Sequence, residues 1–414
     1  MCLKIIGEVE EGGLLDEVID GHFSSEPVPP AYKPLIYEIA SGVVRWKLYL
    51  DWALSHFVKE GVRKDVRHLL RMSLYQAFFM KKAARRVVNE AVDYAKRERG
   101  QATANFVNAV LRRAIRERNE LPMPDDPVSR LSIAHSFPDW LVRRWHARFA
   151  GRSLEALLAL LNKSPEFALR IDSRRITREE AVSRLADRGV KAVKGRLLEG
   201  ALLVDRLGPL LESGLLKDHV FHVQDETSQM AGLAVGPAPG DLVLDACAGR
   251  GTKTDQIKEE RPSARVVAMD IDGKKLGAVR ATACRLQADV LKSPFKKGCF
   301  DSILLDAPCS SLGIIRKHPE IKWRRSERDI QRYASLQLEM IGVLGENLKP
   351  GGRLIYSVCS FEPEETTDVV EKAKKTGLFA AEASVPYPGQ DGAFLSLPHV
   401  SGMDGFFIAA LRRL

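Results

Sequence analysis

Long apolar runs are missing from this sequence. The opening MCLKIIGEVEEGG holds no stretch long enough for a signal peptide, and no later segment approaches the roughly 20 consecutive apolar residues of a membrane span. Low-complexity tracts are missing too, and hydrophobic residues (45%) are mixed with charged residues of both signs (28%). We therefore expect a globular, cytoplasmic protein with no membrane partner.

Cysteine is scarce and irregularly spaced. No CxxC pair occurs, and no histidine stands at the spacing of zinc ligands; the six cysteines are at positions 2, 247, 284, 299, 309 and 359. This spacing is evidence against a disulfide framework, and we expect no metal cofactor. We interpret Cys2, Cys284 and Cys299 as buried, unreactive small hydrophobic residues.

Acidic residues are outnumbered, because 63 lysines and arginines against 54 acidic residues give a formal charge of +9 and a pI near 9.2. A basic chain favours an anionic partner, with nucleic acid as the leading candidate. The basic residues cluster in KKAARR (81–86), LRRAIRER (111–118) and RKHPEIKWRR (316–325). The first two also fit solvated helix faces. For the third we predict phosphate contact and base stacking, with a core position of Trp323 as the alternative.

The patterns change along a chain that, at 414 residues, is too long for one hydrophobic core. From about residue 13 to residue 120 the apolar positions have helical spacing, and the proline-rich PMPDDP follows as a linker. Further helices and a short alternation of strands and a helix come next. The expected domains are an all-α bundle at 1–125, linker helices with a small α/β domain at 126–220, and a doubly wound, Rossmann-like α/β domain at 221–414.

A nucleotide-like ligand is predicted at the start of the third domain. The apolar strand Leu242 to Leu244 runs into Asp245 and a loop of small residues, and the next strand, VVAMD, ends in Asp270. A small-residue loop permits close approach of a ligand, and a strand-end carboxylate can accept ribose hydroxyls. A dinucleotide dehydrogenase would share both features, but the loop lacks GxGxxG. Two more strand-end acids, Asp289 and Asp306, are expected at the same edge of the sheet.

With these residues the chain resembles the Sun/RsmB (Fmu) family of bacterial 16S ribosomal RNA cytosine-C5 methyltransferases. The motifs that carry the resemblance are VQDETSQ (223–229), DACAGRGTKT (245–254), MDID (269–272), LLDAPCS (304–310), RKHPEIKW (316–323), LKPGGRLIYSVCS (348–360) and DGFFIAAL (404–411). In the front part, RVVNEAV and NFVNAVLRR resemble the NusB-like RNA-binding domain of that family. The resemblance implies a class I methyltransferase domain, S-adenosyl-L-methionine as cofactor, and 16S ribosomal RNA as partner of a monomeric enzyme.

The resemblance also implies where the cofactor lies. Asp270 would hold the ribose, Asp289 and Val290 would flank the adenine, and the loop 247–253 would face the methionine part. The family's usual loop reads CAAPGGK, from which Gly249, Arg250 and Thr252 depart. The full set of expected cofactor residues is Cys247, Ala248, Gly249, Arg250, Gly251, Thr252, Lys253, Asp270, Asp289 and Asp306.

Two cysteines at strand ends fit methylation of cytosine. Carbon 5 of cytosine becomes nucleophilic only after a thiolate has added to carbon 6, and a base must later remove the carbon-5 proton. By resemblance, Cys359 is the nucleophile, Cys309 assists proton removal or product release, and Asp306 binds the N3 and amino edge of the base. Lys253 and Arg316 are candidates for lowering a thiol pKa. The target base must be unstacked to reach the thiol.

Other functions stay open at this point. A methyltransferase for a protein or small molecule would explain the cofactor loop but leave the two cysteines and the basic front end without a role. A non-catalytic RNA-binding factor of NusB type would not need the cysteines, and a transfer RNA could replace ribosomal RNA as substrate.

The third strand of the third domain is short of residues. A helix is predicted from DGKKLGAVRATACRL, residues 272 to 286, and Gln287-Ala288-Asp289 follows at once. A helix commonly needs 2 to 6 residues of connection before a parallel strand. The spacing therefore predicts that residues are absent between Leu286 and Gln287, or else that the third strand is shortened.

Overall fold

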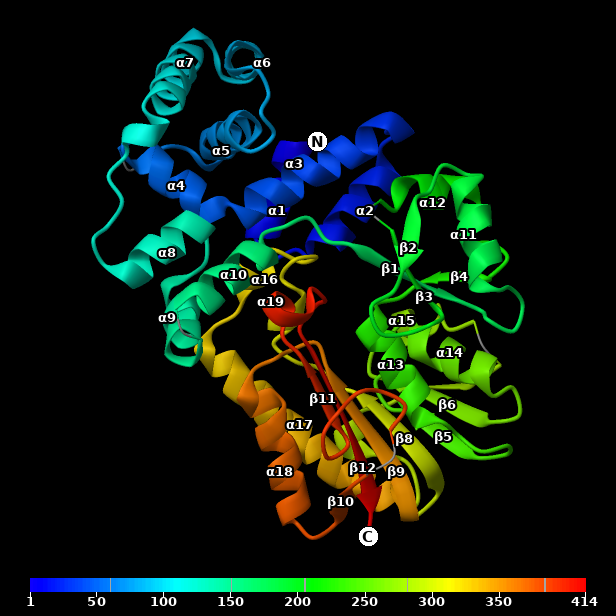
Figure 1. Ribbon diagram of the computed structural model, residues 1–414. Coiled ribbons are helices and arrows are strands. Elements are labelled where there is room, and N and C mark those ends of the chain that lie inside the picture. Colours follow the sequence, from blue (N-terminus) through cyan, green and yellow to red (C-terminus); the bar gives the residue numbers. More distant parts are fainter. Residues whose placement is uncertain (60, 150, 205, 281, 383–384) are drawn as a thin grey trace. The chain divides into compact units, whose positions relative to one another are not determined.

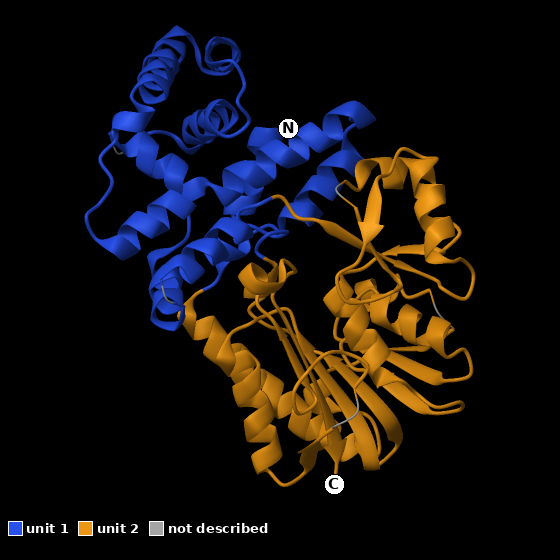
Figure 2. Ribbon diagram, viewed as in Figure 1, with its two compact units in different colours: residues 1–163, 315–325 blue, residues 164–314, 326–414 orange. Residues whose placement is uncertain are grey.

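The computed structural model describes residues 1–414 except 60, 150, 205, 281 and 383–384. The chain divides into two compact units, each of which combines segments distant in the sequence (Figure 2). The first unit consists of residues 1–163 and 315–325, and the second of residues 164–314 and 326–414. Among the described residues, no helix is both long enough and apolar enough to cross a membrane.

The first unit is helical, as predicted. Its α-helices are α1 (Cys2–Glu10), α2 (Leu15–Ser25), α3 (Lys33–Arg45), α4 (Lys47–Ser55), α5 (Lys64–Phe78), α6 (Ala84–Arg99), α7 (Gln101–Arg116), α8 (Pro127–His135), α9 (Asp139–Arg148), α10 (Gly151–Leu161) and α16 (Ile321–Arg324). The buried positions of α6, for example Val87, Val88, Ala91 and Ala95, recur at helical spacing and form one apolar face. Helix α1 lies within the predicted bundle at 1–125 but before residue 13, where the helical apolar spacing was expected to begin.

The segment 315–325 is built into this helical unit. The ammonium of Lys322 is fully buried and donates to the carbonyls of Arg45 (3.2 Å) and Ser136 (3.0 Å) and to Oδ1 of Asn162 (2.6 Å). The indole of Trp323 donates to the Val44 carbonyl at 2.7 Å. Burial, with Arg45 next, holds the pKa of Lys322 well below its usual value.

These contacts correct the prediction that RKHPEIKWRR is an RNA-binding surface. Lys322 and Arg316 are buried, and the indole of Trp323 is partly buried against the apolar cluster of α1 to α3. A buried side chain cannot reach a phosphate, and an indole hydrogen-bonded inside a domain is not free to stack on a base. The alternative stated for Trp323, a core position, is therefore the correct one. In this segment Arg324 is exposed.

The second unit begins with a small antiparallel sheet. Its strands are β1 (Phe167–Ile171), β2 (Ala192–Lys194), β3 (Ala201–Val204) and β4 (Phe221–Val223), in the order β2-β3-β1-β4. The helices α11 (Arg178–Ala186) and α12 (Gly208–Ser213) accompany it, and a capping box of Thr177 and Glu180 starts α11. This sheet is the small α/β domain that the sequence predicts after the linker helices.

A larger mixed sheet follows, with strand order β10-β12-β9-β8-β5-β6-β7 and β11 paired to β12. The strands are β5 (Leu242–Asp245), β6 (Arg265–Asp270), β7 (Cys284–Gln287), β8 (Phe300–Asp306), β9 (Leu348–Val358), β10 (Phe379–Ala381), β11 (Ala393–Ser396) and β12 (Phe406–Arg413). The helices are α13 (Glu226–Val235), α14 (Thr252–Glu260), α15 (Gly273–Leu276), α17 (Glu327–Asn347), α18 (Thr367–Lys375) and α19 (Pro398–Ser401). Strands β5 to β9 pair in parallel, which confirms the predicted Rossmann-like domain.

Helices cover both faces of this sheet. Alternate residues of one strand belong to different apolar clusters: Leu305 packs with residues of α17 and α18, and Leu304 with residues of α13 and α14. Figure 1 shows α17 and α18 on one side of the sheet and α13 and α14 on the other. Buried on both faces, the strands are fixed in register, and so are the loops at their ends.

The third parallel strand corrects the predicted helix at 272–286. Helix α15 has only four residues and ends at Leu276, and Cys284 to Gln287 form β7. Leu286 and Gln287 pair with Met269 and Asp270 as consecutive residues of β7, so the expectation of absent residues is wrong. The helix is shortened instead, and the residues after Leu276 supply the connection. Residue 281 of the predicted helix lies outside the described residues.

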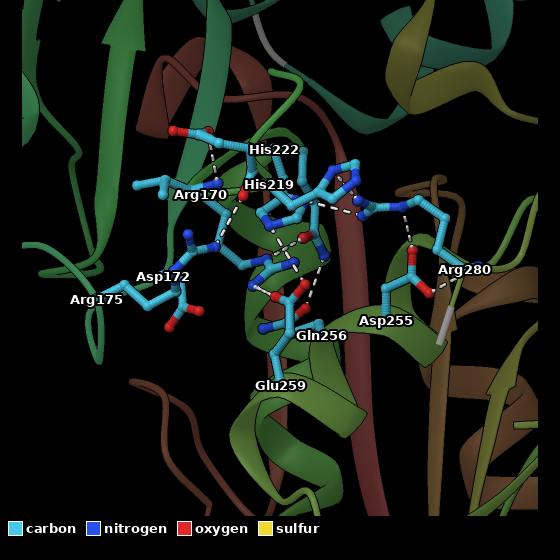
Figure 3. A network of polar contacts seen from close by, with 12 residues as sticks. Arg170, Asp172, Arg175, His219, His222, Asp255, Gln256, Glu259 and Arg280 are labelled. Carbon is cyan, nitrogen blue, oxygen red and sulfur yellow. Dashed lines mark hydrogen bonds and ion pairs between the residues drawn. The ribbon is translucent and has the colours of Figure 1, made fainter. Parts of the chain in front are cut away.

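Arg280 fixes this short connection, as Figure 3 shows. Its guanidinium binds Asp255 of α14 (Nε to Oδ2, 3.0 Å), His219, and Nδ1 of His222 on β4 (3.1 Å). Burial, then Arg170 and Arg280, lower the pKa of His222 to about 3, so the ring is neutral. The polar network thereby ties the small sheet, α14 and the shortened connection together.

The two compact units divide the chain differently from the predicted domains. Helices α8 to α10, which the sequence assigns to the middle domain, and the segment 315–325 both belong to the first unit. The boundaries at 125/126 and 220/221 stay predictions.

We expect Lys322→Met to destabilise the protein by about 2–4 kcal/mol, because the apolar side chain leaves buried acceptors on Arg45, Ser136 and Asn162 without a donor. The measurement is urea unfolding followed by tryptophan fluorescence. Arg324→Met, in the same helix but exposed, is the control and should change stability by less than about 0.5 kcal/mol. Equal unfolding midpoints for the two variants would contradict the anchoring role of Lys322.

Candidate active site

Four aspartates lie at the carboxyl edge of the large sheet, as the sequence predicts. Asp245, Asp270 and Asp306 end the neighbouring parallel strands β5, β6 and β8, and Asp289 follows β7. Their joint effect is visible at Cys247, whose pKa is raised by burial and then by all four carboxylates. The edge therefore has a negative potential, which fits a ligand that carries positive charge and hydroxyl groups.

The loop 247–253 closes tightly around its own backbone. Gly249 and Gly251 have φ of 54° and 83°, in the left-handed region, and the Gly251 amide donates to the Ala248 carbonyl at 2.8 Å. A Cβ on Gly251 would lie 2.7 Å from a methyl group of Val279. Arg250 and Thr252, which depart from the family's usual loop, are both exposed. These two substitutions leave the tight turn intact.

Asp270 and Asp289 are held by backbone amides. Asp270 accepts from the Gly249 amide with Oδ2 and from the Asp272 amide with Oδ1, both at 2.8 Å. Asp289 accepts from the Leu291 amide at 3.0 Å. Each carboxylate oxygen keeps a further lone pair, and both side chains are half-buried. Oriented, half-buried carboxylates beside a glycine loop fit the ribose and adenine of a nucleoside.

Asp306 is fixed from two sides. Lys253 donates to its Oδ2 at 2.6 Å, and the Ser357 hydroxyl donates to its Oδ1 at 2.8 Å. Burial lowers the pKa of Lys253, but the charge and hydrogen bond of Asp306, together with Asp245 and Cys359, outweigh burial, and the pKa of Lys253 is raised. The ammonium predicted to lower a thiol pKa is therefore hydrogen-bonded to Asp306. Arg316, the other candidate, lies in the first unit, where its carbonyl accepts from Arg45.

The structure brings Cys309 and Cys359 together. Their sulfur atoms are 3.2 Å apart, and Ser311 Oγ lies 3.8 Å from Cys309 Sγ and 3.5 Å from Cys359 Sγ. The hydrogen bond with Cys309 lowers the pKa of Cys359, aided by Ser311, while the same bond and burial raise the pKa of Cys309. Cys359 is thus the thiol that ionises more readily, and Cys309 is the one that keeps its proton.

The two cysteine loops are also joined through their backbones. The Gly313 amide donates to the Cys359 carbonyl at 3.0 Å, and the Gly405 amide donates to the Gly313 carbonyl at 2.9 Å. A Cβ on Gly313 would come within 1.9 Å of the Gly405 carbonyl oxygen, so glycine is required there. Ser311 adopts φ of 62°, a conformation unusual for serine. The thiol geometry therefore depends on three chain segments in direct contact.

Some site features escape sequence reasoning. Ser311 and Ser357 contact the predicted residues, and their positions beside the cysteines in DAPCSS and YSVCS are the only signal for them. Among the other cysteines, Cys284 is exposed on β7, so the prediction that it is buried is wrong. Cys2 and Cys299 are of intermediate exposure.

Asp245 is a buried carboxyl just before the loop 247–253. Its exposed fraction is 1%, Oδ2 accepts from the Thr254 hydroxyl at 2.6 Å, and Oδ1 has no hydrogen-bond partner among the described residues. Burial raises its pKa to about 6, and the bond from Thr254 only partly offsets this effect. Above that pH the folded protein carries a poorly solvated negative charge.

Three family models match this chain. The model described as 16S rRNA methyltransferase RsmB/F matches residues 232–412, the NusB family model matches residues 2–116, and a model described as the ferredoxin-like domain of RsmF/B-like methyltransferases matches residues 137–210. Strands β1 to β3 of the small sheet lie within the residues that the ferredoxin-like model matches.

Similar proteins cover almost the whole chain. A Bacillus subtilis protein named probable ribosomal RNA small subunit methyltransferase B is 31% identical over 410 residues, which are 92% of this chain and 90% of the relative. A Pasteurella multocida ribosomal RNA small subunit methyltransferase B is 33% identical over 402 residues, with 92% and 88% covered. The crystal structure of the protein PH0851 has the same fold, with a TM-score of 0.80 at 24% identity over 96% of this chain and 93% of that chain.

We expect Asp245→Asn to stabilise the protein at high pH. The pKa of Asp245 is raised from 3.8 to about 6 in the folded protein. The protonated carboxyl therefore leaves the folded state at full stability below pH 3.8, and this stability is lost as the pH rises through 6. The loss is about 3 kcal/mol when ionisation is complete. The difference in unfolding free energy between the variant and the parent should therefore grow from near zero at pH 4 to its full value at pH 8. Asp241→Asn, on the nearby turn before β5, is the control. A difference that does not vary with pH would contradict the raised pKa.

Proposed function

This chain belongs to the RsmB/F family of 16S rRNA methyltransferases, and we propose that it forms 5-methylcytosine in small-subunit ribosomal RNA through a covalent thiol adduct. Membership makes it an RNA methyltransferase that uses S-adenosyl-L-methionine. What we propose is that the methylated base is cytosine, that the methyl group is placed on carbon 5, and that the residues have the roles given below. The observation that carries the proposal is the contact between the Cys309 and Cys359 thiols. They lie at the same edge of the sheet as the loop 247–253 and the carboxylate of Asp306, which Lys253 holds in place.

In this proposal, different residues bind different parts of S-adenosylmethionine. The loop 247–253 would hold the methionine part, Asp270 the ribose hydroxyls, and Asp289 with Val290 the adenine. The negative edge formed by the four aspartates suits the sulfonium charge of S-adenosylmethionine. When bound there, S-adenosylmethionine supplies an electrophilic methyl group to a carbon nucleophile.

Cys359 is the nucleophile in this proposal. As a thiolate it adds to carbon 6 of cytosine, and the electron pair of the 5,6 double bond then moves toward carbon 5 and the N3 edge. Asp306, held by Lys253 and Ser357, accepts from the amino group of cytosine and fixes the ring over the thiol. The proton that Cys359 gives up passes through the Asp306 carboxyl to N3, where it neutralises the charge that addition creates. The lowered pKa of Cys359 supports its role as the attacking group.

Cys309 serves the second half of the reaction. After the methyl group has joined carbon 5, the proton at carbon 5 must leave and the bond from carbon 6 to Cys359 must break. Cys309 touches Cys359 and is the thiol that holds its proton, so it gives that proton to the departing Cys359 sulfur and takes up the proton from carbon 5. Without this exchange the enzyme would remain bonded to the RNA.

The RNA substrate follows from the helical unit and the relatives. Residues 2–116 match the NusB family, and α6 and α7 carry exposed arginines such as Arg85, Arg112 and Arg116 that suit phosphate contact. The relatives are named as acting on the small ribosomal subunit RNA, which favours 16S RNA over transfer RNA. We infer a monomeric, cytoplasmic enzyme that takes an unstacked cytosine.

Bisulfite sequencing of 16S RNA tests the proposal. In a strain that lacks this gene, one cytosine should lose its protection from deamination. The native gene should restore that protection, and a gene encoding Cys359→Ala should not, although the variant protein accumulates to the same level. Unchanged protection in the deletion strain across the whole 16S RNA would contradict the proposal.

We further expect the two cysteine variants to behave differently with RNA and cofactor in vitro. Cys309→Ala should form an enzyme–RNA complex that survives denaturing electrophoresis, because addition proceeds and elimination stalls. Cys359→Ala should form no such complex. A stable complex with Cys359→Ala, but not with Cys309→Ala, would reverse the two assignments.

A further inference from the structure

Each of the two reactive cysteines is followed by a buried serine. Ser310 comes after Cys309 and Ser360 after Cys359, and both serines have an exposed fraction of 0%. Their hydroxyl oxygens are 3.3 Å apart, although the residues are 50 positions apart in the sequence. The serines therefore mark a second meeting point of the two loops, next to the two cysteines in sequence.

One buried carboxylate joins these serines. Glu365 accepts from the Ser310 amide with Oε1 at 2.6 Å, and from the Ser310 and Ser360 hydroxyls with Oε2 at 2.5 Å and 2.6 Å. Its exposed fraction is 0%. A fourth donor, Nε2 of Gln337, lies 3.5 Å from Oε1. Burial raises the pKa of this carboxyl, and the bonds from Ser310 and Ser360 offset part of that effect.

Glu365 is itself held rigidly. Its carbonyl accepts from the Tyr356 hydroxyl at 2.6 Å, and Tyr356 also donates to Gln337 of α17 at 2.9 Å. Gln337 in turn donates to the carbonyl of Pro308, directly before Cys309, at 2.9 Å. The carboxylate is thus fixed to β9 and α17, the elements that support both cysteine loops.

We propose that Glu365 is a positioning residue that holds the Cys309 and Cys359 thiols in contact by binding Ser310 and Ser360 at once. It touches neither thiol and acts through the two serines. The proposal rests on the proposed function in one respect, that these two thiols are the reacting pair. Its geometric content, the distance between the thiols, can be measured without RNA or cofactor.

A carboxylate suits this position better than an amide. Four donors point at its two oxygens, and glutamine has the same shape but only one acceptor oxygen. With that oxygen on the Ser310 amide, the NH2 group of glutamine would face both serine hydroxyls, which must turn to accept from it, and the charge-assisted bonds that join the two loops are lost. Glu365→Gln therefore weakens the link between the loops while it preserves the packed volume. Glu364→Gln is the matched control, because the neighbouring Glu364 is only half-buried and accepts from Gln331 at 3.2 Å.

The charge of Glu365 has an effect opposite to its positioning role. The carboxylate raises the pKa of both thiols, so its neutralisation should lower both pKa values and speed thiolate reactions. Loss of positioning should instead slow any step in which one thiol must reach the other. A slower step in Glu365→Gln can therefore be assigned to geometry.

The rate of disulfide formation between Cys309 and Cys359 measures how well the two thiols are held together. In the full-length protein without RNA, 4,4′-dithiodipyridine is attacked by the Cys359 thiolate, which forms a mixed disulfide and releases one thiopyridone. Cys309 then loses its proton to solvent and attacks the Cys359 sulfur, so that the protein disulfide forms and a second thiopyridone leaves. The reagent takes up the two electrons. The rate of the second step, read by peptide mass spectrometry of the Cys309–Cys359 disulfide, reports how close the thiols are held.

We expect the second step in Glu365→Gln to be slower than in the native protein by about tenfold or more, and unchanged in Glu364→Gln. Ser360→Ala removes one donor to Glu365 and should also slow the second step. This variant replaces Glu365→Gln as the test if Glu365→Gln does not fold. In methylation, Glu365→Gln should lower kcat and leave KM for RNA unchanged. A native rate in both Glu365→Gln and Ser360→Ala, or no Cys309–Cys359 disulfide in the native protein, would overturn the proposal. Slowed disulfide formation in a protein that methylates no RNA would instead overturn the proposed function alone.

Discussion

The pairing of β8 with β9 is the constraint on which the site depends. In this parallel register Asp306 lies opposite Ser357, and the two cysteines follow three and two residues later on adjacent loops. Both strands are buried on both faces, so a shift of one residue would turn the apolar side chains of a whole strand to the wrong face. The thiol contact, the Asp306 hydrogen bond from Ser357 and the backbone bonds around Gly313 all follow from this register.

The carboxyl groups near these two strands are stabilised by polar partners, because burying an isolated charge is unfavourable. Asp306 is balanced by Lys253, and Glu365 receives four hydrogen bonds, whereas Asp245 has only one from Thr254. In the proposed mechanism Asp306 binds the base and must stay accessible, while Glu365 supports the two cysteine loops. Of these three carboxyls, Asp245 is the one whose charge is least compensated, and it is expected to cost stability at neutral pH.

Much of this site was predictable from sequence because its signals are local. A strand followed by an acid, a loop of small residues, and a cysteine after each of two apolar strands are all read from neighbouring residues. The shared edge of the sheet then follows from the parallel topology alone. The helical front unit was equally readable from its apolar periodicity, apart from α1, which lies before residue 13, where the predicted helical pattern begins.

Other features depend on partners far away in the sequence. RKHPEIKWRR reads as a basic surface, yet Lys322 and Trp323 bind backbone carbonyls of α3, about 280 residues earlier. Glu365 stands in FEPEE, which resembles an exposed acidic turn, and only the fold shows that two of its glutamates, Glu362 and Glu365, are fully buried. Helix α15 was overestimated because helix-forming residues continue beyond Leu276, where the contacts of Arg280 with Asp255 and His222 favour a connection instead.

The central claim is that Cys359, and not Cys309, bonds to cytosine. It is tested most directly with RNA that carries 5-fluorocytidine, because fluorine at carbon 5 cannot leave as a proton does and the adduct persists. After incubation with S-adenosylmethionine and digestion of both protein and RNA, mass spectrometry should find the methylated fluoronucleotide on the peptide that contains Cys359. The same mass on the peptide that contains Cys309, with Cys359 unmodified, would contradict the account.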